Sequence, residues 1–197
     1  MEIYYIGGSP CSGKSTVAEA LAARYELAYF KADDYLETFL ARGAAAGLSV
    51  CQQIQAMSAD ENWLRPPEMQ CREELAFYHE IAPFVMEKLA EISASRVIAE
   101  GAAFLPCLMR NAARYIAITP SREFQFSRYR KRPWVPHILR DCSDKEAAFT
   151  NWMERDALFA EEVRHQCVQL SLPHLLTDGS VPPEARLQQV AEHFRLL

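Results

Sequence analysis

The chain has 197 residues, half of them apolar and about a quarter charged, with a formal net charge of −5 at pH 7. The length allows one domain with a substantial core, and the acidic balance argues against a nucleic-acid partner. No apolar run approaches the roughly 20 residues of a membrane span, and Glu2 in a strand-like N-terminus argues against a signal peptide. We therefore expect a single cytoplasmic domain, 1–197, with no membrane partner; the sequence leaves monomer and homodimer open.

The six cysteines are far apart in the sequence and form no C-x-x-C pair. This spacing suits neither a zinc site nor a disulfide framework, so we expect reduced thiols. Cys11 precedes a predicted helix, whose N-terminus lowers a thiol pKa, and we expect it to be more reactive than the other five.

The most specific pattern is the run Gly8-Ser9-Pro10-Cys11-Ser12-Gly13-Lys14-Ser15, which fits G-x-x-x-x-G-K-[ST]. A short apolar strand pattern, 3–6, precedes it, and a helical pattern, 17–25, follows. Strand, glycine-rich loop and helix is the context that a phosphate-binding P-loop requires. The residues predicted to contact a nucleotide are Gly8, Ser9, Pro10, Cys11, Ser12, Gly13, Lys14, Ser15 and Thr16. Lys14 is predicted to reach the β- and γ-phosphates, and Ser15 to ligate Mg²⁺.

A second buried strand, 27–31, leads into the acidic pair Asp33 and Asp34 and a helix over 35–41. Residues that follow the carboxyl ends of parallel strands face the ligand crevice, so one of these carboxylates is a candidate for catalysis or Mg²⁺ binding. The alternative is that either aspartate only caps the helix.

The region 43–67 predicts an irregular helical insertion that covers an acceptor substrate. Arg42, Arg65 and Arg72 are candidates there for holding an anionic group, although exposed arginines are usually solvated. A long helical pattern follows over 68–92, and Pro83 is expected to kink or split that helix.

A third strand, 96–101, ends in an acid, Glu100, which is the natural candidate for holding Mg²⁺ or its water shell. Gly101 permits close backbone approach at this strand end. Another strand is predicted over 114–118.

Basic residues concentrate between 121 and 142, followed by an amphipathic helix over 144–170. Arg128 and Arg132 are placed at i and i+4 on one helix face, and Arg155 lies on the later helix. We interpret 121–156 as an arginine-rich lid that offsets charge on a transferred phosphate. The alternatives are a solvated basic face or an RNA-binding patch, and the acidic overall balance disfavours the latter.

A last strand, 173–177, precedes the loop Thr177–Val181 and a closing helix, 183–194. In the sheet order of small kinases this loop lies beside the P-loop, where its backbone can line an adenine pocket.

With these elements in this order, the chain resembles the small P-loop kinases of the nucleoside-monophosphate-kinase-like fold, which include shikimate, gluconate and uridine kinases. The resemblance implies a three-layer α/β/α fold, with a five-stranded parallel sheet in the order 2-3-1-4-5 and a helical lid. It also implies ATP and Mg²⁺. The acids depart from the D-x-D pair of shikimate kinases, and Glu100-Gly101-Ala102-Ala103 replaces their glycine triplet. The acceptor is therefore left unnamed.

On this basis we expect an ATP-dependent phosphotransferase that moves the γ-phosphate to a hydroxyl or phosphate of a small molecule. Lys14, Asp33, Asp34, Arg128, Arg132 and Arg155 are its predicted catalytic residues, and Ser15 and Glu100 its predicted metal ligands. A GTPase needs a guanine-reading N-K-x-D segment, which the chain lacks, and a motor or AAA-type ATPase needs a longer chain. A regulatory ATP-binding module without kinase activity stays as the alternative.

Overall fold

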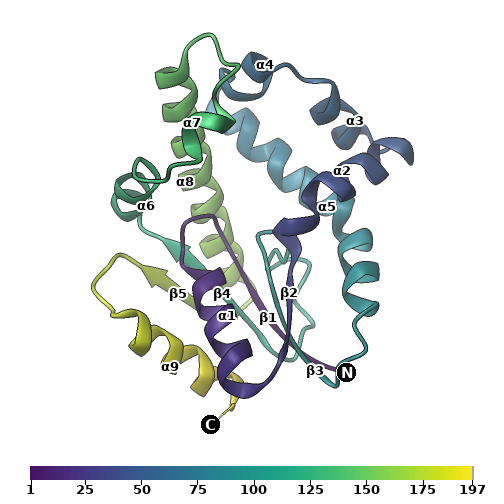
Figure 1. Cartoon of the computed structure of the whole chain (residues 1–197), viewed down its shortest axis with the longest axis vertical. Coiled ribbons are helices and arrows are strands. Elements are labelled where there is room, and N and C mark those ends of the chain that lie inside the picture. Colours follow the sequence, from purple (N-terminus) through teal and green to yellow (C-terminus); the bar gives the residue numbers. More distant parts are fainter. Residues whose placement is uncertain (197) are drawn as a thin grey trace.

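A computed structural model describes residues 1–196, and its centre is a sheet of five parallel strands (Figure 1). The strands are β1 (Glu2–Gly8), β2 (Ala28–Lys31), β3 (Arg96–Glu100), β4 (Tyr115–Pro120) and β5 (His174–Thr177). Their spatial order is β2-β3-β1-β4-β5, which confirms the predicted sheet. In the register, Ile6 of β1 pairs with Glu100 of β3 and with Ile116 of β4. The loop after β1 and the acid that ends β3 therefore lie at the same edge of the sheet.

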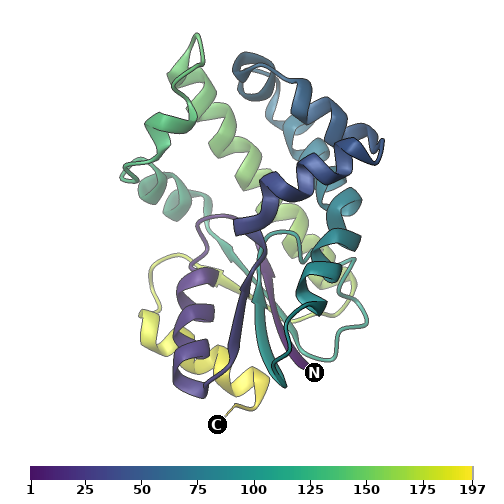
Figure 2. The same ribbon diagram turned by 45° about the vertical axis from the view of Figure 1, so that its right-hand side comes forward.

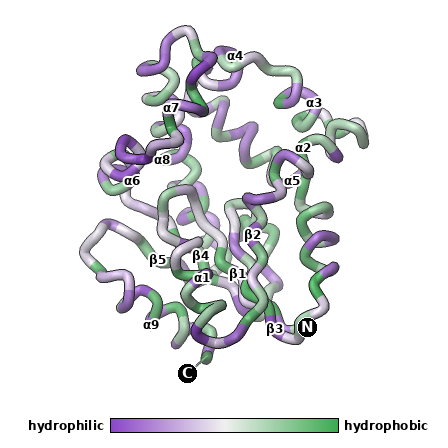
Figure 3. Tube along the Cα trace, viewed as in Figure 1, coloured by the Kyte–Doolittle hydropathy of each residue, from purple (hydrophilic) through white to green (hydrophobic). Residues whose placement is uncertain are grey.

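Helices cover both faces of the sheet, as the continuous apolar character of its inner strands requires. On one face, α1 (Lys14–Tyr25) and α9 (Pro183–Phe194) pack over a core that contains Ile6, Ile98 and Ile118. On the other face lie α5 (Pro67–Ala90) and α8 (Lys145–Gln169), over a core that contains Val97 and Ala117. Figure 2 shows the sheet between these two layers, and Figure 3 shows the strands as a mostly hydrophobic centre.

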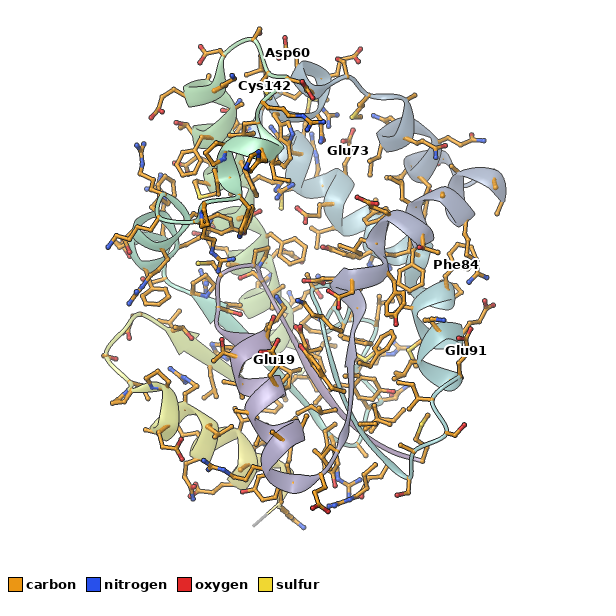
Figure 4. The ribbon with its side chains drawn as sticks, in the orientation of Figure 1. Glu19, Asp60, Glu73, Phe84, Glu91 and Cys142 are labelled. Carbon is orange, nitrogen blue, oxygen red and sulfur yellow. The ribbon has the colours of Figure 1, made fainter. Side chains whose placement is uncertain are left out.

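The long helices α5 and α8 extend beyond the carboxyl edge of the sheet and carry two groups of short helices (Figure 1). One group contains the 3-10 turn η1 (Ala32–Tyr35), α2 (Leu36–Ala45), α3 (Ser49–Ala56) and α4 (Ala59–Trp63). The other contains α6 (Arg122–Tyr129) and α7 (Val135–Ile138). The two groups meet where the Ser143 amide donates to Asp60 Oδ1 at 2.8 Å, and Figure 4 shows Asp60 beside Cys142 there.

Aromatic packing holds the second group on α8. Trp152 lies at the centre of this cluster, with ring centroids 4.8 Å from Trp63, 5.3 Å from Tyr129 and 5.8 Å from Trp134. Aromatic pairs at these separations add to the free energy gained by burial. The segment after β4 is therefore anchored to α8 by its own small core rather than by the sheet.

The structure decides three local expectations. The helix α5 runs through Pro83 without being split, which leaves a kink as the expected effect of this proline. Neither Asp33 nor Asp34 caps α2, whose N-cap is Tyr35. The helix α6 ends at Tyr129, so Arg132 does not share a helix face with Arg128. Within residues 1–196, no helix is long and apolar enough to cross a membrane.

Candidate active site

The loop between β1 and α1 has the backbone that the motif predicts. Gly8 has φ 124°, and a Cβ atom there would overlap the carbonyl group of Ile118 on β4. Gly13 has φ 85° with open space around it, so glycine is favoured there by backbone conformation alone. Cys11 adopts φ 62° without being glycine. The loop therefore needs a glycine at Gly8 for space and at Gly13 for conformation.

The side chains of this loop are buried, and several lack partners. Lys14 is only 5% exposed, with its Nζ 3.4 Å from the Ser9 carbonyl oxygen. The Ser9 and Ser12 hydroxyls are buried without a hydrogen-bond partner. Buried polar groups are normally satisfied, so a buried cation beside two unsatisfied hydroxyls fits a site for an anionic ligand such as a phosphate chain.

Cys11 lies in the P-loop beside Arg132. Burial raises the pKa of the Cys11 thiol, although Arg132, whose Nη2 lies 3.6 Å from the sulfur, acts in the opposite direction. Burial also raises the pKa of each of the other five thiols, so the greater reactivity of Cys11 stays a prediction. The cysteines are free, and among residues 1–196 no cluster of three His, Cys, Asp or Glu side chains could hold a metal ion by itself.

Glu100, the acid that ends β3, is fully buried beside the P-loop. Its Oε1 accepts a hydrogen bond from the Tyr29 hydroxyl at 3.0 Å, whereas its Oε2 has no partner. Burial raises the pKa of Glu100; the positive charge of Lys14 opposes this rise, the carboxylate of Asp33 adds to it, and the Ser15 hydroxyl lowers the pKa. These influences place Lys14, Ser15 and Asp33 around one half-satisfied carboxylate. Such a donor set fits Mg²⁺ held through protein oxygens and water.

The two adjacent aspartates have different surroundings in the structure. Asp33 is half-buried, and its Oδ1 lacks a partner. It also lies close to β3, because a Cβ at Gly101 would sit 3.1 Å from Asp33 Oδ1. Asp34 is exposed, pairs with Lys31 at 3.3 Å and lines a different surface hollow. Asp33 is therefore the candidate that faces Glu100, and Asp34 is directed away from it.

A cavity of about 610 Å³ lies on the outer side of the P-loop. Its walls come from the end of the P-loop, the first turns of α1, the segment 124–133 and the loop after β5. The Thr177 hydroxyl donates to the Ser12 carbonyl at 2.9 Å, which confirms that this last loop lies beside the P-loop. Arg128 and Arg132 both line the cavity. The volume lies within the usual range for small-molecule sites.

A second cavity, of about 230 Å³, lies between α2, α3, α5 and α8. Arg155 lines it rather than the first cavity, and its guanidinium is already paired: Nε lies 2.9 Å from Glu74 Oε2, and Nη2 lies 2.6 Å from Asp156 Oδ1. Arg155 is thus a buried ion-pair residue of α8. The structure does not bring it together with Arg128 and Arg132.

The two carboxylates that hold Arg155 were not predicted from the sequence. Burial raises the pKa of Glu74 to about 7, opposed by the charge of Arg155 and reinforced by Asp156. Burial also raises the pKa of Asp156, which is fully buried with its Oδ2 unpartnered. Asp33 adds to the rise of the Glu74 pKa, so Asp33 acts electrostatically on both Glu100 and Glu74. It is therefore close enough to both carboxylates to influence them, although it does not line the second cavity.

Of these missed residues, only Asp156 carried a signal in the sequence, as the neighbour of Arg155 in a helix predicted to be amphipathic. Glu74 and Tyr29 carried none, because their roles depend on which elements α5 and β2 pack against.

Comparisons with known proteins support this architecture. No family model matches the chain, and no curated protein matches it. Among solved structures, the shikimate kinase from Bacteroides thetaiotaomicron is similar at a TM-score of 0.55 and 16% identity, over 97% of both chains. The shikimate kinase from Aquifex aeolicus has a TM-score of 0.49 and 19% identity, over 99% of this chain and 96% of its own.

At such identities the similarity shows the fold. The chain has the fold of the small P-loop kinases, as the motif and the order of elements predicted. The similarity does not select a subfamily within that fold.

Proposed function

We propose that the protein is an ATP-dependent phosphotransferase that moves the γ-phosphoryl group to a hydroxyl of a small molecule. The observation that carries this proposal is the position of Asp33. This carboxylate lies beside the end of β3 at the P-loop, and its charge also acts on Glu74, which lines a second, separate cavity. A nucleotide-binding module needs only the first of these two sites, whereas group transfer needs both.

In this proposal the 610 Å³ cavity takes the nucleoside of ATP, and the P-loop takes its phosphates. Lys14 and the loop amides bind the β- and γ-phosphates, while Arg128 and Arg132 approach from the lid side. Ser15 and the free oxygen of Glu100 are the residues that would hold Mg²⁺ and its water. Bound Mg²⁺ would neutralise negative charge on the phosphates.

Asp33 orients the acceptor hydroxyl and takes its proton as the new bond forms. The bond between the γ-phosphorus and the β–γ bridging oxygen breaks, a bond from that phosphorus to the acceptor oxygen forms, and ADP leaves with the bridging electron pair. The protein forms no covalent bond in this scheme, so its contribution is positioning and electrostatic stabilisation.

The proposal is tested by measuring ATP turnover with pools of sugars, amino sugars, nucleosides and amino alcohols. Lys14→Ala is expected to lose at least about 100-fold in turnover, because it removes the buried cation at the phosphates. Asp33→Asn is expected to lose about 10²- to 10⁴-fold through loss of a general base. Asp34→Asn is the matched control and is expected to keep wild-type turnover.

Acceptor-independent turnover that Asp33→Asn does not change would refute a phosphotransferase. The protein would then be the regulatory ATP-binding module.

A further inference from the structure

The second cavity is lined by arginines, but neither of them is free to bind an anion. The guanidinium groups of Arg65 and Arg155 line it, and free guanidinium groups commonly bind a carboxylate or a phosphate. Both are already engaged by the protein's own carboxylates. Arg65 donates from Nη1 and Nη2 to the two oxygens of Glu73, at 2.6 and 2.5 Å. The Arg155 guanidinium lies between Glu74 and Asp156.

The acids outnumber the cations around this cavity. Glu37, Glu73 and Glu74 line it, and Asp156 is buried behind Arg155. Both ion pairs are largely shielded from water, with the Arg65, Glu73, Arg155 and Glu74 side chains between 14% and 19% exposed. Charges in such surroundings are weakly screened, so each guanidinium is held by its own carboxylate partner and is not free for an entering anion.

The buried polar atoms without hydrogen-bond partners around the cavity also favour a ligand that donates hydrogen bonds. Gln70 is only 3% exposed, and its Nε2 donates to the carbonyl oxygens of Trp63 and Arg65. These two bonds fix the amide orientation, and they leave Oε1 as a buried acceptor without a donor. Glu74 Oε2 also accepts no hydrogen bond, although it is ion-paired with Arg155 Nε. One donor, Arg65 Nε, is also unpartnered, and it suits a hydroxyl oxygen.

The space is small and partly apolar. The cavity measures about 230 Å³, below the roughly 300–1,000 Å³ of drug-sized sites, and Leu36, Leu40 and Phe77 form part of its wall. Glu73, which lines this cavity, is labelled on the upper part of α5 in Figure 4. A ligand that fits offers several hydrogen-bond donors on a compact skeleton.

We infer that the acceptor is a compact hydroxyl compound that bears an amine, such as an amino sugar or amino alcohol, and not a carboxylate or phosphate ester. The inference rests on the proposed function, since it names the substrate class of the same site. The ammonium group donates to Gln70 Oε1 and the Glu74 carboxylate, and a neighbouring hydroxyl presents its proton to Asp33.

Three sugars with a common ring test the charge preference: glucosamine, glucose and glucuronic acid. Their dissociation constants are measured by calorimetry, and phosphorylation is measured with ATP and Mg²⁺. We expect glucosamine to bind and react about tenfold better than glucose, since a hydrogen bond to a charged group is stronger than a neutral one, and glucuronic acid to be the poorest. Preferred binding of glucuronic acid, equal binding of the three sugars or no binding of any of them would overturn the inference.

A variant pair localises the preference. Glu73→Gln frees the two terminal nitrogens of Arg65, so the ratio of glucosamine to glucuronic acid binding is expected to fall about tenfold. Glu87→Gln is the matched control on α5, because it breaks an exposed pair with Arg42 outside the cavity, and it should leave the ratio unchanged. An unchanged ratio in a folded Glu73→Gln protein, checked by circular dichroism, contradicts the assignment. Gln70→Leu gives a second test and should weaken glucosamine binding about tenfold.

These outcomes separate the two proposals. Tighter binding of glucosamine with no phosphoryl transfer leaves the charge preference standing and refutes the phosphotransferase. Transfer to glucuronic acid in preference to glucosamine supports the phosphotransferase and refutes the amine-bearing acceptor.

Discussion

Replacing Glu74 by glutamine perturbs the charge arrangement around Arg155 without changing the shape of the side chain. Arg155 faces two carboxylates, Glu74 and Asp156, in a region that is nearly closed to water. One positive charge does not balance two negative ones, and burial raises the pKa of Glu74 from the ordinary 4.5 to about 7. Glutamine stays neutral at every pH and removes this titration.

The magnitude follows from linkage between protonation and folding. Because the pKa of Glu74 is higher in the folded than in the unfolded chain, folded Glu74 holds its proton more tightly. Its contribution to stability is fully present below pH 4.5 and is lost as the pH rises through 7. The difference between 4.5 and about 7 corresponds to about 3 kcal/mol. Relative to wild type, Glu74→Gln should therefore gain about 3 kcal/mol between pH 4.5 and pH 8.

The assay is urea unfolding of both proteins at intervals from pH 5 to pH 8, analysed as the difference in unfolding free energy at each pH. Glu80→Gln is the control on the same helix. Its burial favours the protonated form, but the amides of Val50 and Cys51 donate to it and the pKa of Glu80 is lowered overall. Because Glu80 titrates at or below 4.5 in both the folded and the unfolded chain, the difference between Glu80→Gln and wild type should be flat from pH 5 to pH 8. A flat difference curve for Glu74→Gln would show that Glu74 is ionised throughout and would refute the reasoning.

Three further perturbations test the P-loop and its neighbours. Gly8→Ala should lower the unfolding free energy by about 3 kcal/mol, because its Cβ meets the Ile118 carbonyl. Gly13→Ala has open space around its Cβ and should cost only about 1–2 kcal/mol, from its backbone conformation. Equal losses for the two variants in urea unfolding would contradict this contrast. Tyr29→Phe removes the hydrogen-bond donor to Glu100 Oε1, so the Mg²⁺ concentration that half-saturates ATP turnover should rise about tenfold. An unchanged Mg²⁺ titration would count against Glu100 as a metal ligand. Thr177→Val loses the hydrogen bond to the Ser12 carbonyl and should weaken ATP binding, measured by calorimetry, about fivefold. An unaltered affinity would show that the loop after β5 does not contribute to nucleotide binding.

The parts of the molecule that follow from local chemistry were predictable from the sequence. The P-loop needs glycines at Gly8 and Gly13 for reasons of space and backbone conformation, and both the strand before it and the helix after it showed the expected hydrophobic pattern. The sheet order came from the resemblance to small P-loop kinases, and the structure confirms it. The acid at the end of β3 was identified because only the strand boundary was needed to place Glu100 at the ligand edge.

The parts that depend on packing between distant elements were not predictable. Whether Asp33 or Asp34 faces the site is decided by the 3-10 turn at Ala32–Tyr35, which directs one inward and leaves the other with Lys31. Arg155 looked like a lid arginine because the sequence did not show that α5 brings Glu74 against it. Arg65 likewise looked free until Glu73 was seen to engage it. The role of a basic residue can be predicted from the sequence only when its acidic partners are known.

The central claim is group transfer from ATP to a hydroxyl, and phosphorus NMR tests it most directly. Wild-type protein is incubated with ATP, Mg²⁺ and a mixture of amino sugars and amino alcohols, alongside Lys14→Ala and Asp33→Asn. We predict a new phosphomonoester resonance that grows in equal amount with ADP in the wild type and is lost in both variants. Formation of ADP and inorganic phosphate alone, at the same rate in the wild type and Asp33→Asn, would contradict the account.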